Sequence, residues 1–268
     1  MNMPLRLAVI GDPVAHSASP ELHRAFLAAA RLEGTYEPIV VRAGGAARAI
    51  EELRAAGYGG LNVTTPLKEE AFARAETRDA AAAAAGAVNT LLLRTRIEGY
   101  NTDGIGALTA LTDAGLSGIA GSRILVLGGG ATARTSVAAL NAANAAVFLW
   151  SRTPEQSERI ACELGGRPWH ARLRVDAVFA ALAPGATLHD PKLMAILHAA
   201  PIVVDANYGS RATLGTALGR SDVHDGRAML RSSSRASFSL FQTLAPGACV
   251  DDVHLMRRPD RGEVCRDI

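Results

Sequence analysis

Short apolar runs alternate with longer amphipathic stretches along the chain, and this rhythm predicts an α/β fold. In the first half, strands are expected at residues 5–10, 36–41 and 59–63, with helices at 20–32 and 46–56. Because strands and helices alternate here, we expect these residues to form a small α/β unit of their own.

The same pattern returns in the second half. Residues 124–127 are apolar throughout and predict a strand buried on both faces. Residues 132–143 are rich in alanine and free of helix breakers, so they predict a helix packed on that strand, and 145–150 predict the next strand. Between the two halves, a strand is expected from 86 to 93 and a helix over 104–115.

The turn between the strand at 124–127 and its helix has the glycines of a nucleotide-phosphate site. Gly128 allows a tight turn, and Gly130 has no Cβ to keep a pyrophosphate from the amides at the helix N-terminus. Ala133 stands where the dinucleotide-binding fingerprint has a third small residue, for close helix packing. A strand-to-helix turn without a ligand is the alternative. The candidate cofactor-binding residues of this turn are Gly128, Gly129, Gly130, Ala131, Thr132 and Ala133.

The end of the next strand indicates which dinucleotide binds. About 20 residues after Gly128, an NAD-binding unit has Asp or Glu for the ribose 2′-hydroxyl. This chain has Ser151, Arg152 and Thr153. A carboxylate would repel a 2′-phosphate, whereas Arg with two hydroxyls can bind it through charge-assisted hydrogen bonds. The sequence therefore favours NADP over NAD, and an Arg in a solvated turn is the alternative.

Two charged residues indicate chemistry on an alcohol. Pro66 is expected to open a helix and to place Lys68 in its first turn, where the lysine charge is unfavourable beside the helix dipole. Asp103 either caps the helix at 104–115 or faces Lys68 across a cleft. A Lys/Asp pair with a nicotinamide suffices to oxidise an alcohol, since one member handles the hydroxyl proton while hydride leaves carbon. A solvated lysine is the alternative.

Polar side chains follow the predicted strands of the first half. Ser17 and Ser19 lie on a Gly- and Pro-bounded loop of the kind that lines a crevice, and Ser19 is also predicted to cap the next helix. Asn62 and Thr64 point to the same side if their strand continues that far. His23 is expected to be a satisfied core histidine and not a general base.

Composition excludes several classes of protein. The 268 residues are 49% hydrophobic and 20% charged, which is ordinary for a globular protein with two domains, and a net charge of +2 is too small to indicate nucleic acid. Cys162, Cys249 and Cys265 lack metal-site spacing, so we expect reduced thiols and no metal. No run approaches a signal peptide or the ~20 apolar residues of a membrane span. We therefore expect a cytoplasmic protein that binds neither nucleic acid nor membrane.

Five segments resemble the shikimate dehydrogenase family, in the family's order and spacing. These polar and glycine-containing segments are residues 11–20, 62–68, 86–90, 101–104 and 128–134. The resemblance covers nearly the whole chain. It implies a substrate domain from residues 1–103 and 238–268, a Rossmann-like NADP-binding domain from 104–237, and a reaction in the cleft between them.

The resemblance also implies a reaction and residue roles. An NADP-dependent oxidoreductase, a monomer or homodimer in aromatic amino acid biosynthesis, would interconvert 3-dehydroshikimate and shikimate, with Lys68 and Asp103 as the catalytic pair. The residues expected to bind the substrate carry hydroxyl, amide or charged groups: Ser17, Ser19, Asn62, Thr64, Lys68, Asn89, Asp103, Tyr208 and Ser233. Those expected to bind NADP beyond the Gly-rich turn are Ser151, Arg152, Thr153, Ala206 and Gly226.

Two segments depart from the family's pattern. Residues 180–185 read Ala-Ala-Leu-Ala-Pro-Gly where the family usually has Asn-Ala-Thr-Ser before a Gly, and Ser233 stands where a glutamine usually reaches the substrate. A lost contact to a substrate hydroxyl costs about 1 kcal/mol. Quinate or an amino-substituted analogue as substrate, and a ligand-binding paralogue with little turnover, therefore stay open. Arg227, Arg231 and Arg235 share a predicted helix face, either as a solvated stripe or facing an anionic ligand.

Overall fold

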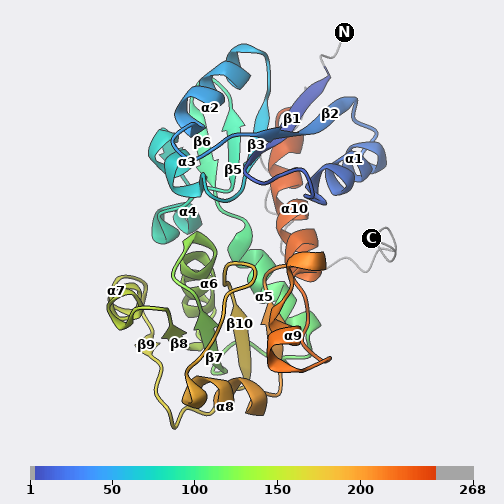
Figure 1. Cartoon of the computed structure of the whole chain (residues 1–268). Coiled ribbons are helices and arrows are strands. Elements are labelled where there is room, and N and C mark those ends of the chain that lie inside the picture. The colour runs from blue at the N-terminus through green and yellow to red at the C-terminus, as the bar shows by residue number, and fades with distance from the viewer. Residues whose placement is uncertain (1–3, 246–268) are drawn as a thin grey trace.

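The computed structural model describes residues 4–245. Two β-sheets lie in separate halves of the molecule, and helices α5 (Asp103–Asp113), on the second sheet, and α10 (Arg227–Gln242), which extends along the first, pack on each other where the halves meet (Figure 1). Each half packs its own helices on its own sheet, which confirms the predicted α/β class.

The first sheet has six strands in the order β2-β1-β3-β5-β6-β4. The strands are β1 (Leu5–Gly11), β2 (Gly34–Val40), β3 (Gly60–Val63), β4 (Thr77–Arg78), β5 (Thr90–Leu93) and β6 (Ile97–Tyr100). β1 pairs in parallel with β2 and β3, whereas β5 runs antiparallel to both β3 and β6. The ends of β1, β3 and β6 and the start of β5 therefore lie at the same edge of this sheet.

Side chains of the first sheet alternate between two cores. The helices of this half are α1 (Ser19–Ala29), α2 (Ala46–Ala55), α3 (Lys68–Arg74) and α4 (Ala80–Ala85). Ala8 and Ile10 of β1 pack in the core formed with α2, α3 and α4, while Leu7 and Val9 pack on the opposite face with α1 and α10. Helix α10 thus covers a sheet that lies more than one hundred residues before it in the chain.

The second sheet has five parallel strands in the order β11-β10-β7-β8-β9. Its strands are β7 (Arg123–Leu127), β8 (Ala146–Trp150), β9 (Arg167–Pro168), β10 (Ala177–Ala180) and β11 (Val203–Asp205), and its helices are α6 (Ala131–Ala142), α7 (Pro154–Leu164), α8 (Pro191–Ala199), η1 (Gly209–Arg211) and α9 (Leu214–Leu218). The first strand of the unit is central and the chain winds outward on both sides of it, which is the topology of a dinucleotide-binding unit.

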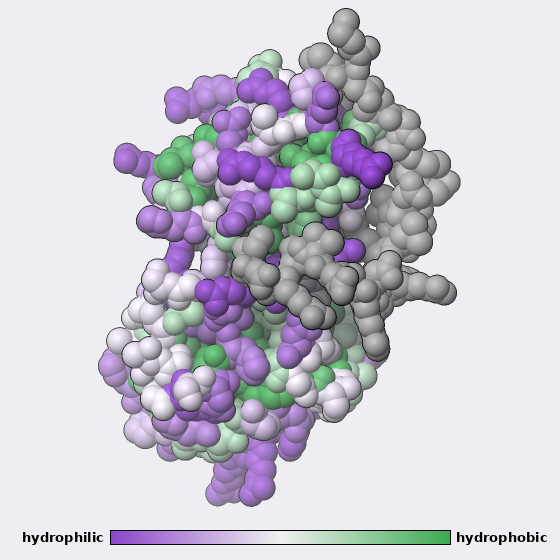
Figure 2. All heavy atoms as spheres, turned by 90° about the vertical axis from the view of Figure 1, so that its right-hand side faces the viewer, coloured by the Kyte–Doolittle hydropathy of each residue, from purple (hydrophilic) through white to green (hydrophobic). Residues whose placement is uncertain are grey.

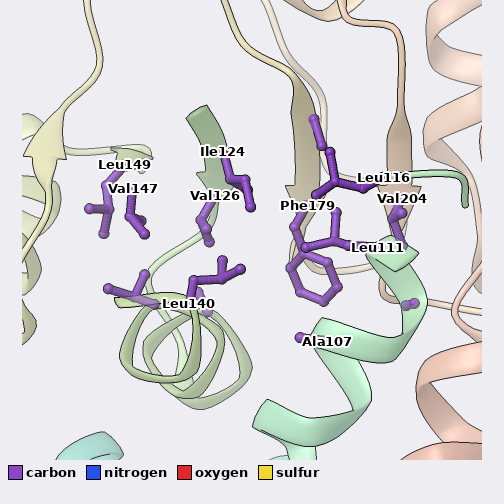
Figure 3. Close-up of a cluster of buried hydrophobic side chains, with 14 of the residues drawn as sticks. Ala107, Leu111, Leu116, Ile124, Val126, Leu140, Val147, Leu149, Phe179 and Val204 are labelled. Atoms are coloured by element: carbon purple, nitrogen blue, oxygen red, sulfur yellow. The ribbon is translucent and has the colours of Figure 1, made fainter. Parts of the chain in front are cut away.

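Helices cover both faces of the second sheet. On one face, Phe179 of β10 and Val126 of β7 meet Ala107 of α5 and Leu140 of α6 in one cluster (Figure 3). The other side chains of β7, such as Leu125, pack against α8 and α9. Because both faces are buried, the strand carries an unbroken apolar run, as predicted for residues 124–127.

Two helix starts differ from the predictions. Ser19 does not cap α1: it is the first residue of the helix, and the N-cap residue is Ala18, whose side chain makes no cap hydrogen bond. Pro66 does not open α3, since the backbone at residues 64–67 first closes a hydrogen-bonded turn and the helix begins at Lys68. Lys68 still lies in the first turn, as expected.

The strand expected from residue 86 begins only at Thr90. Gly86 has a φ of 65° and ends α4 in the left-handed conformation, which an extended strand cannot include. The other predicted elements differ from the observed ones by a few residues at their ends.

Helix α10 is continuous across residues 237 and 238, where the predicted domain boundary lies. The assignment of 1–103 with 238–268, and of 104–237, stays a prediction, and residues 246–268 lie outside the described part.

Polar residues are scattered over both halves of the face in Figure 2. Within residues 4–245, none of the helices has the length and apolar character needed to cross a membrane.

Candidate functional site

The topology of the first sheet brings three distant residues to one edge. β3 leads into the turn before Lys68, β6 leads into Asp103, and Asn89 immediately precedes β5. Since β5 runs antiparallel to both neighbours, its first residue lies beside their last residues. Lys68, Asn89 and Asp103 therefore meet, although none of them is close to another in the sequence.

Lys68 and Asp103 form a buried ion pair. Lys68 Nζ donates to Asp103 Oδ2 at 2.5 Å, and the two residues are only 8% and 7% exposed. Asn89 Nδ2 donates to the other carboxylate oxygen, Oδ1, at 2.7 Å. The Asp103 side chain does not cap α5, because the residue is already helical and its backbone N–H donates to Asn101 Oδ1 at 3.0 Å. Of the two interpretations of Asp103, the cap is wrong and the pairing with Lys68 is observed.

Hydrogen bonds connect this cluster to the second half of the molecule. Lys68 Nζ also donates to Thr132 Oγ1 of α6 at 3.2 Å. On the loop after β1, the backbone N–H of Ala18 donates to the hydroxyl of Tyr208, which follows β11, at 3.4 Å. The ion pair thus touches the helix that follows the Gly-rich turn, and the serine loop touches Tyr208.

The side-chain amide of Asn62 is fixed by its own sheet. Its Oδ1 accepts from the hydroxyl of Tyr36 at 2.7 Å, and its Nδ2 donates to Asn89 O at 3.3 Å and to Thr90 Oγ1 at 3.1 Å. β3 ends at Val63, as predicted, so the condition under which Asn62 and Thr64 would point to the same side is not met. Both amide hydrogens of Asn62 are engaged by the protein, which leaves only its oxygen with capacity to bind a ligand.

Tyr36 also belongs to this cluster, although its sequence context predicts only a strand residue. Burial raises the pKa of the Tyr36 hydroxyl well above its usual range, and nearby Tyr208 adds to the rise. The only signal in the sequence was a tyrosine in a predicted strand. The alternation of side chains along that strand places Tyr36 on the face that α1 covers. Tyr36 therefore connects the fixed amide of Asn62 to the neighbourhood of Tyr208.

His23 is a core residue, as expected, but one of its ring nitrogens lacks a hydrogen-bond partner among the described residues. It is fully buried and stacks on Tyr36 with ring centroids 4.2 Å apart, while Nε2 lies 3.5 Å from Ser237 Oγ. Among the described residues, Nδ1 has no hydrogen-bond partner. Burial lowers the pKa of His23 to about 3, so the ring is neutral in the folded protein at ordinary pH.

The remaining candidates of the first half lie on the loops at this edge. Ser17 Oγ accepts from the backbone N–H of Ser19 at 3.2 Å. Thr64 packs against Gly11, where a Cβ would collide with Thr64 Cγ2. Ser233 of α10 joins the cluster from the C-terminal side of the chain and contacts Asp103.

The Gly-rich turn fits a pyrophosphate. Gly128 has a φ of 124°, and a Cβ there would collide with the carbonyl of Ala181. Gly130 is the N-cap of α6 without a side-chain cap bond, and no atom lies within 4 Å of the place a Cβ would take. Uncapped amides next to open space at a helix N-terminus favour an anion. Ala133 is fully buried and packs on the sheet, in agreement with the predicted close approach.

The residues after β8 present an exposed cation. Ser151 is buried and its hydroxyl donates to Thr153 O at 2.6 Å, whereas Arg152 is exposed. Gln156, which is not among the predicted site residues, donates from Nε2 to Gly129 O at 3.2 Å and occupies the space that a Cβ on Gly129 would need. Its place in the first turn of α7, just after Thr153, was the available signal.

Ala206 and Gly226 bring two loops of the second half into contact. A Cβ on Gly226 would collide with the carbonyl of Ala206, and the Gly226 N–H donates to Asn207 O at 2.8 Å. Asn207 Nδ2 in turn donates to Leu182 O at 3.0 Å. Residues 180–185, the segment that departs from the family's pattern, thus contribute the backbone carbonyls of Ala180 and Leu182 to this contact between loops.

Comparisons with known proteins point to one family. The family model described as the shikimate dehydrogenase substrate binding domain matches residues 9–91. A protein of Methanothrix thermoacetophila named shikimate dehydrogenase (NADP(+)) is 36% identical over 247 residues, which are 88% of this chain and 91% of the relative. A protein of Acidiphilium cryptum with the same name is 41% identical over 204 residues, 73% of this chain and 74% of the relative.

A solved structure agrees with these relatives. Shikimate 5-dehydrogenase from Thermus thermophilus, in complex with NADP(H) and shikimate, matches with a TM-score of 0.75 and 32% identity. The match covers 90% of this chain and 95% of that protein.

Proposed function

The chain belongs to the shikimate dehydrogenase family, and we propose that it interconverts 3-dehydroshikimate and shikimate with NADP. One observation carries this proposal: the buried Lys68–Asp103 pair lies within hydrogen-bond reach of Thr132, in the first turn of the helix that follows the Gly-rich turn. A proton-handling pair beside a dinucleotide site is the arrangement that alcohol oxidation requires.

Residues of the second half would hold the cofactor. The uncapped start of α6 and the open space at Gly130 fit the pyrophosphate, and exposed Arg152 would bind the 2′-phosphate. When bound, NADP supplies the hydride acceptor for oxidation of the alcohol.

The ion pair would move the proton of the reacting hydroxyl. As the alcohol is oxidised, the carbon-bound hydrogen would leave with its electron pair to the bound dinucleotide. The hydroxyl proton would pass to Lys68 Nζ as Lys68 gives one of its own protons to the carboxylate of Asp103, and the two transfers would reverse when the ketone is reduced. Asp103 holds Nζ at 2.5 Å, and Asn89 holds the opposite carboxylate oxygen at 2.7 Å. The pair is therefore oriented before the substrate arrives, so little reorganisation accompanies the reaction.

The cyclic acid would occupy the junction between the two halves. Its carboxylate and hydroxyls would be bound by the polar side chains gathered there: Ser17, Ser19, Asn62, Thr64 and Tyr208. Asn89, whose amide hydrogens are directed at Asp103 and Thr102, would contribute by holding Asp103. A cytoplasmic location, and a monomeric or homodimeric state, stay predictions from the sequence.

The proposal is tested by initial rates of NADPH formation with shikimate, with quinate as a parallel substrate and NAD as a parallel cofactor. We expect turnover of shikimate with NADP in the ordinary enzyme range of about 1 to 1,000 per second. Faster turnover of quinate than of shikimate would show that quinate is the preferred substrate. Saturable NADPH binding without turnover of either acid would instead indicate a ligand-binding paralogue.

A further inference from the structure

We infer that Ser233 is a positioning residue that holds the carboxylate of Asp103 and does not bind the substrate directly. The inference rests on the proposed function for the assignment of Asp103 to catalysis. It departs from the role that the family resemblance implied, in which the residue at this place reaches the substrate.

The hydrogen bonds of Ser233 are all directed at the protein. Its Oγ donates to Asp103 Oδ1 at 3.3 Å, lies 2.9 Å from Thr102 Oγ1, and accepts from Asn89 Nδ2 at 3.4 Å. A serine hydroxyl has one hydrogen to donate and two lone pairs to accept with. With Thr102 as a donor, the one hydrogen of Ser233 is directed at Asp103 and one lone pair at Thr102, while the other lone pair faces Asn89 Nδ2, whose two hydrogens also serve Asp103 and Thr102. Ser233 therefore has no hydrogen left to donate to a substrate hydroxyl.

The packing of α5 against α10 brings Ser233 to Asp103. Asp103 and Gly106 are three residues apart, so they lie on the same side of α5. A Cβ on Gly106 would lie 2.7 Å from Met229 O and 3.3 Å from Ser233 Cβ, which shows that the two helices touch there. Glycine permits this close approach, and a short side chain at 233 then ends at the carboxylate one turn earlier on α5.

The carboxylate of Asp103 is held from both sides. Oδ2 accepts from Lys68, while Oδ1 accepts from Asn89 and Ser233. Removing the Ser233 hydroxyl withdraws one of the two donors at Oδ1 and takes a partner from Thr102. The carboxylate would then be held at Oδ1 by Asn89 alone and would keep less firmly the orientation in which it holds Lys68, which affects the chemical step and not the contacts to the substrate.

The test separates kcat from KM in three variants. For Ser233→Ala we expect kcat to fall about tenfold while KM for shikimate stays within about twofold, because a hydrogen bond to a charged group is lost. Ser233→Thr keeps a hydroxyl and should restore most of the rate. Ser232→Ala is the matched control, since Ser232 is the preceding residue on α10 and its Oγ lies 2.9 Å from Thr109 Oγ1 instead. A raised KM with unchanged kcat in Ser233→Ala would overturn the inference.

A second measurement does not depend on turnover. The side-chain amide of Asn89 contacts both Asp103 and Ser233, so its ¹H–¹⁵N cross-peak should move in Ser233→Ala, return in Ser233→Thr and stay in place in Ser232→Ala. An unmoved Asn89 signal in Ser233→Ala would overturn the positioning role. If the wild-type protein turns over no cyclic acid, the proposed function fails, and this signal still decides whether Ser233 holds the cluster.

Discussion

The two sides of the junction are built by different means. On the first side, Lys68, Asn89 and Asp103 are buried side chains that bond one another, so each fixes the next. On the second side, the start of α6 at Gly130 offers backbone amides, and the charged group at Arg152 is exposed. A substitution on the first side strands a buried partner, whereas one on the second side leaves the backbone in place. We therefore expect the first side to be much less tolerant of change.

The largest effect is expected for Lys68→Ala. Loss of the proton-handling group should lower kcat for shikimate by about 1,000-fold, within the range that general acid–base groups contribute. The variant should still bind NADPH, because the groups proposed to hold the dinucleotide belong to α6 and to the loop after β8. Steady-state rates and NADPH fluorescence titration measure the two quantities separately.

Lys192→Ala is the matched control for this variant, since Lys192 is exposed at the start of α8. Removing Lys68 also leaves the carboxylate of Asp103 buried without its cation, so thermal unfolding must show that the variant is folded at the assay temperature. A folded Lys68→Ala protein with the wild-type rate would exclude the proposed mechanism.

Arg152→Ala tests the second side of the comparison. The substitution should weaken NADP binding about tenfold and change NAD binding little, since Arg152 is expected to contact only the 2′-phosphate. Arg159→Ala, an exposed arginine on α7, serves as the control. Calorimetric titration with both dinucleotides gives the ratio, and equal losses for the two would show that Arg152 does not read the phosphate.

A pH experiment tests whether the core beneath the first sheet, around His23, also tolerates little change. His23 has a folded-state pKa of about 3 against 6.5 in the unfolded chain, so between these values the unfolded state binds a proton that the folded state does not. Stability should therefore fall as pH falls, by about 2 kcal/mol between pH 7 and pH 5 from this residue.

His23→Phe keeps an aromatic ring against Tyr36 and should remove that part of the pH dependence. His189→Phe, at an exposed position, should leave it unchanged. Urea unfolding at both pH values measures the difference, and an unaltered pH dependence in His23→Phe would mean that another group causes it.

The sequence predicted the elements that local patterns determine. The apolar run at 124–127 predicted a strand buried on both faces. The glycines after it predicted the start of the next helix, where the structure has open space beside Gly130. Lys68 stood out because a lysine in the first turn of a helix needs a partner, and the structure supplies Asp103.

What the sequence could not supply are contacts set by tertiary packing. Nothing local shows that Tyr36 would fix the amide of Asn62, or that Gln156 would cover Gly129. The contacts of Ser233 depend on the approach of α10 to Gly106, two segments far apart in the chain. Helix caps were also mispredicted, because hydrogen-bonded turns compete with capping at the loop ends around the site.

The smallest effect is expected for Gly130→Ala. This substitution adds only a methyl group, so it tests whether the second side of the junction uses backbone amides instead of side chains. Gly130 has a φ of −85°, which alanine adopts freely, and no atom lies within 4 Å of the new Cβ. The free energy of unfolding should therefore stay within about 0.5 kcal/mol of the wild type, as for a surface substitution. If the open space is where the pyrophosphate approaches the amides of α6, the methyl group should still weaken NADPH binding, by about three- to tenfold. Gly118→Ala, equally open and before β7 at the opposite end of that strand from the start of α6, should change neither quantity. Unchanged NADPH binding in Gly130→Ala would place the dinucleotide elsewhere, whereas weaker binding at unchanged stability would show that this side of the junction uses backbone amides and space.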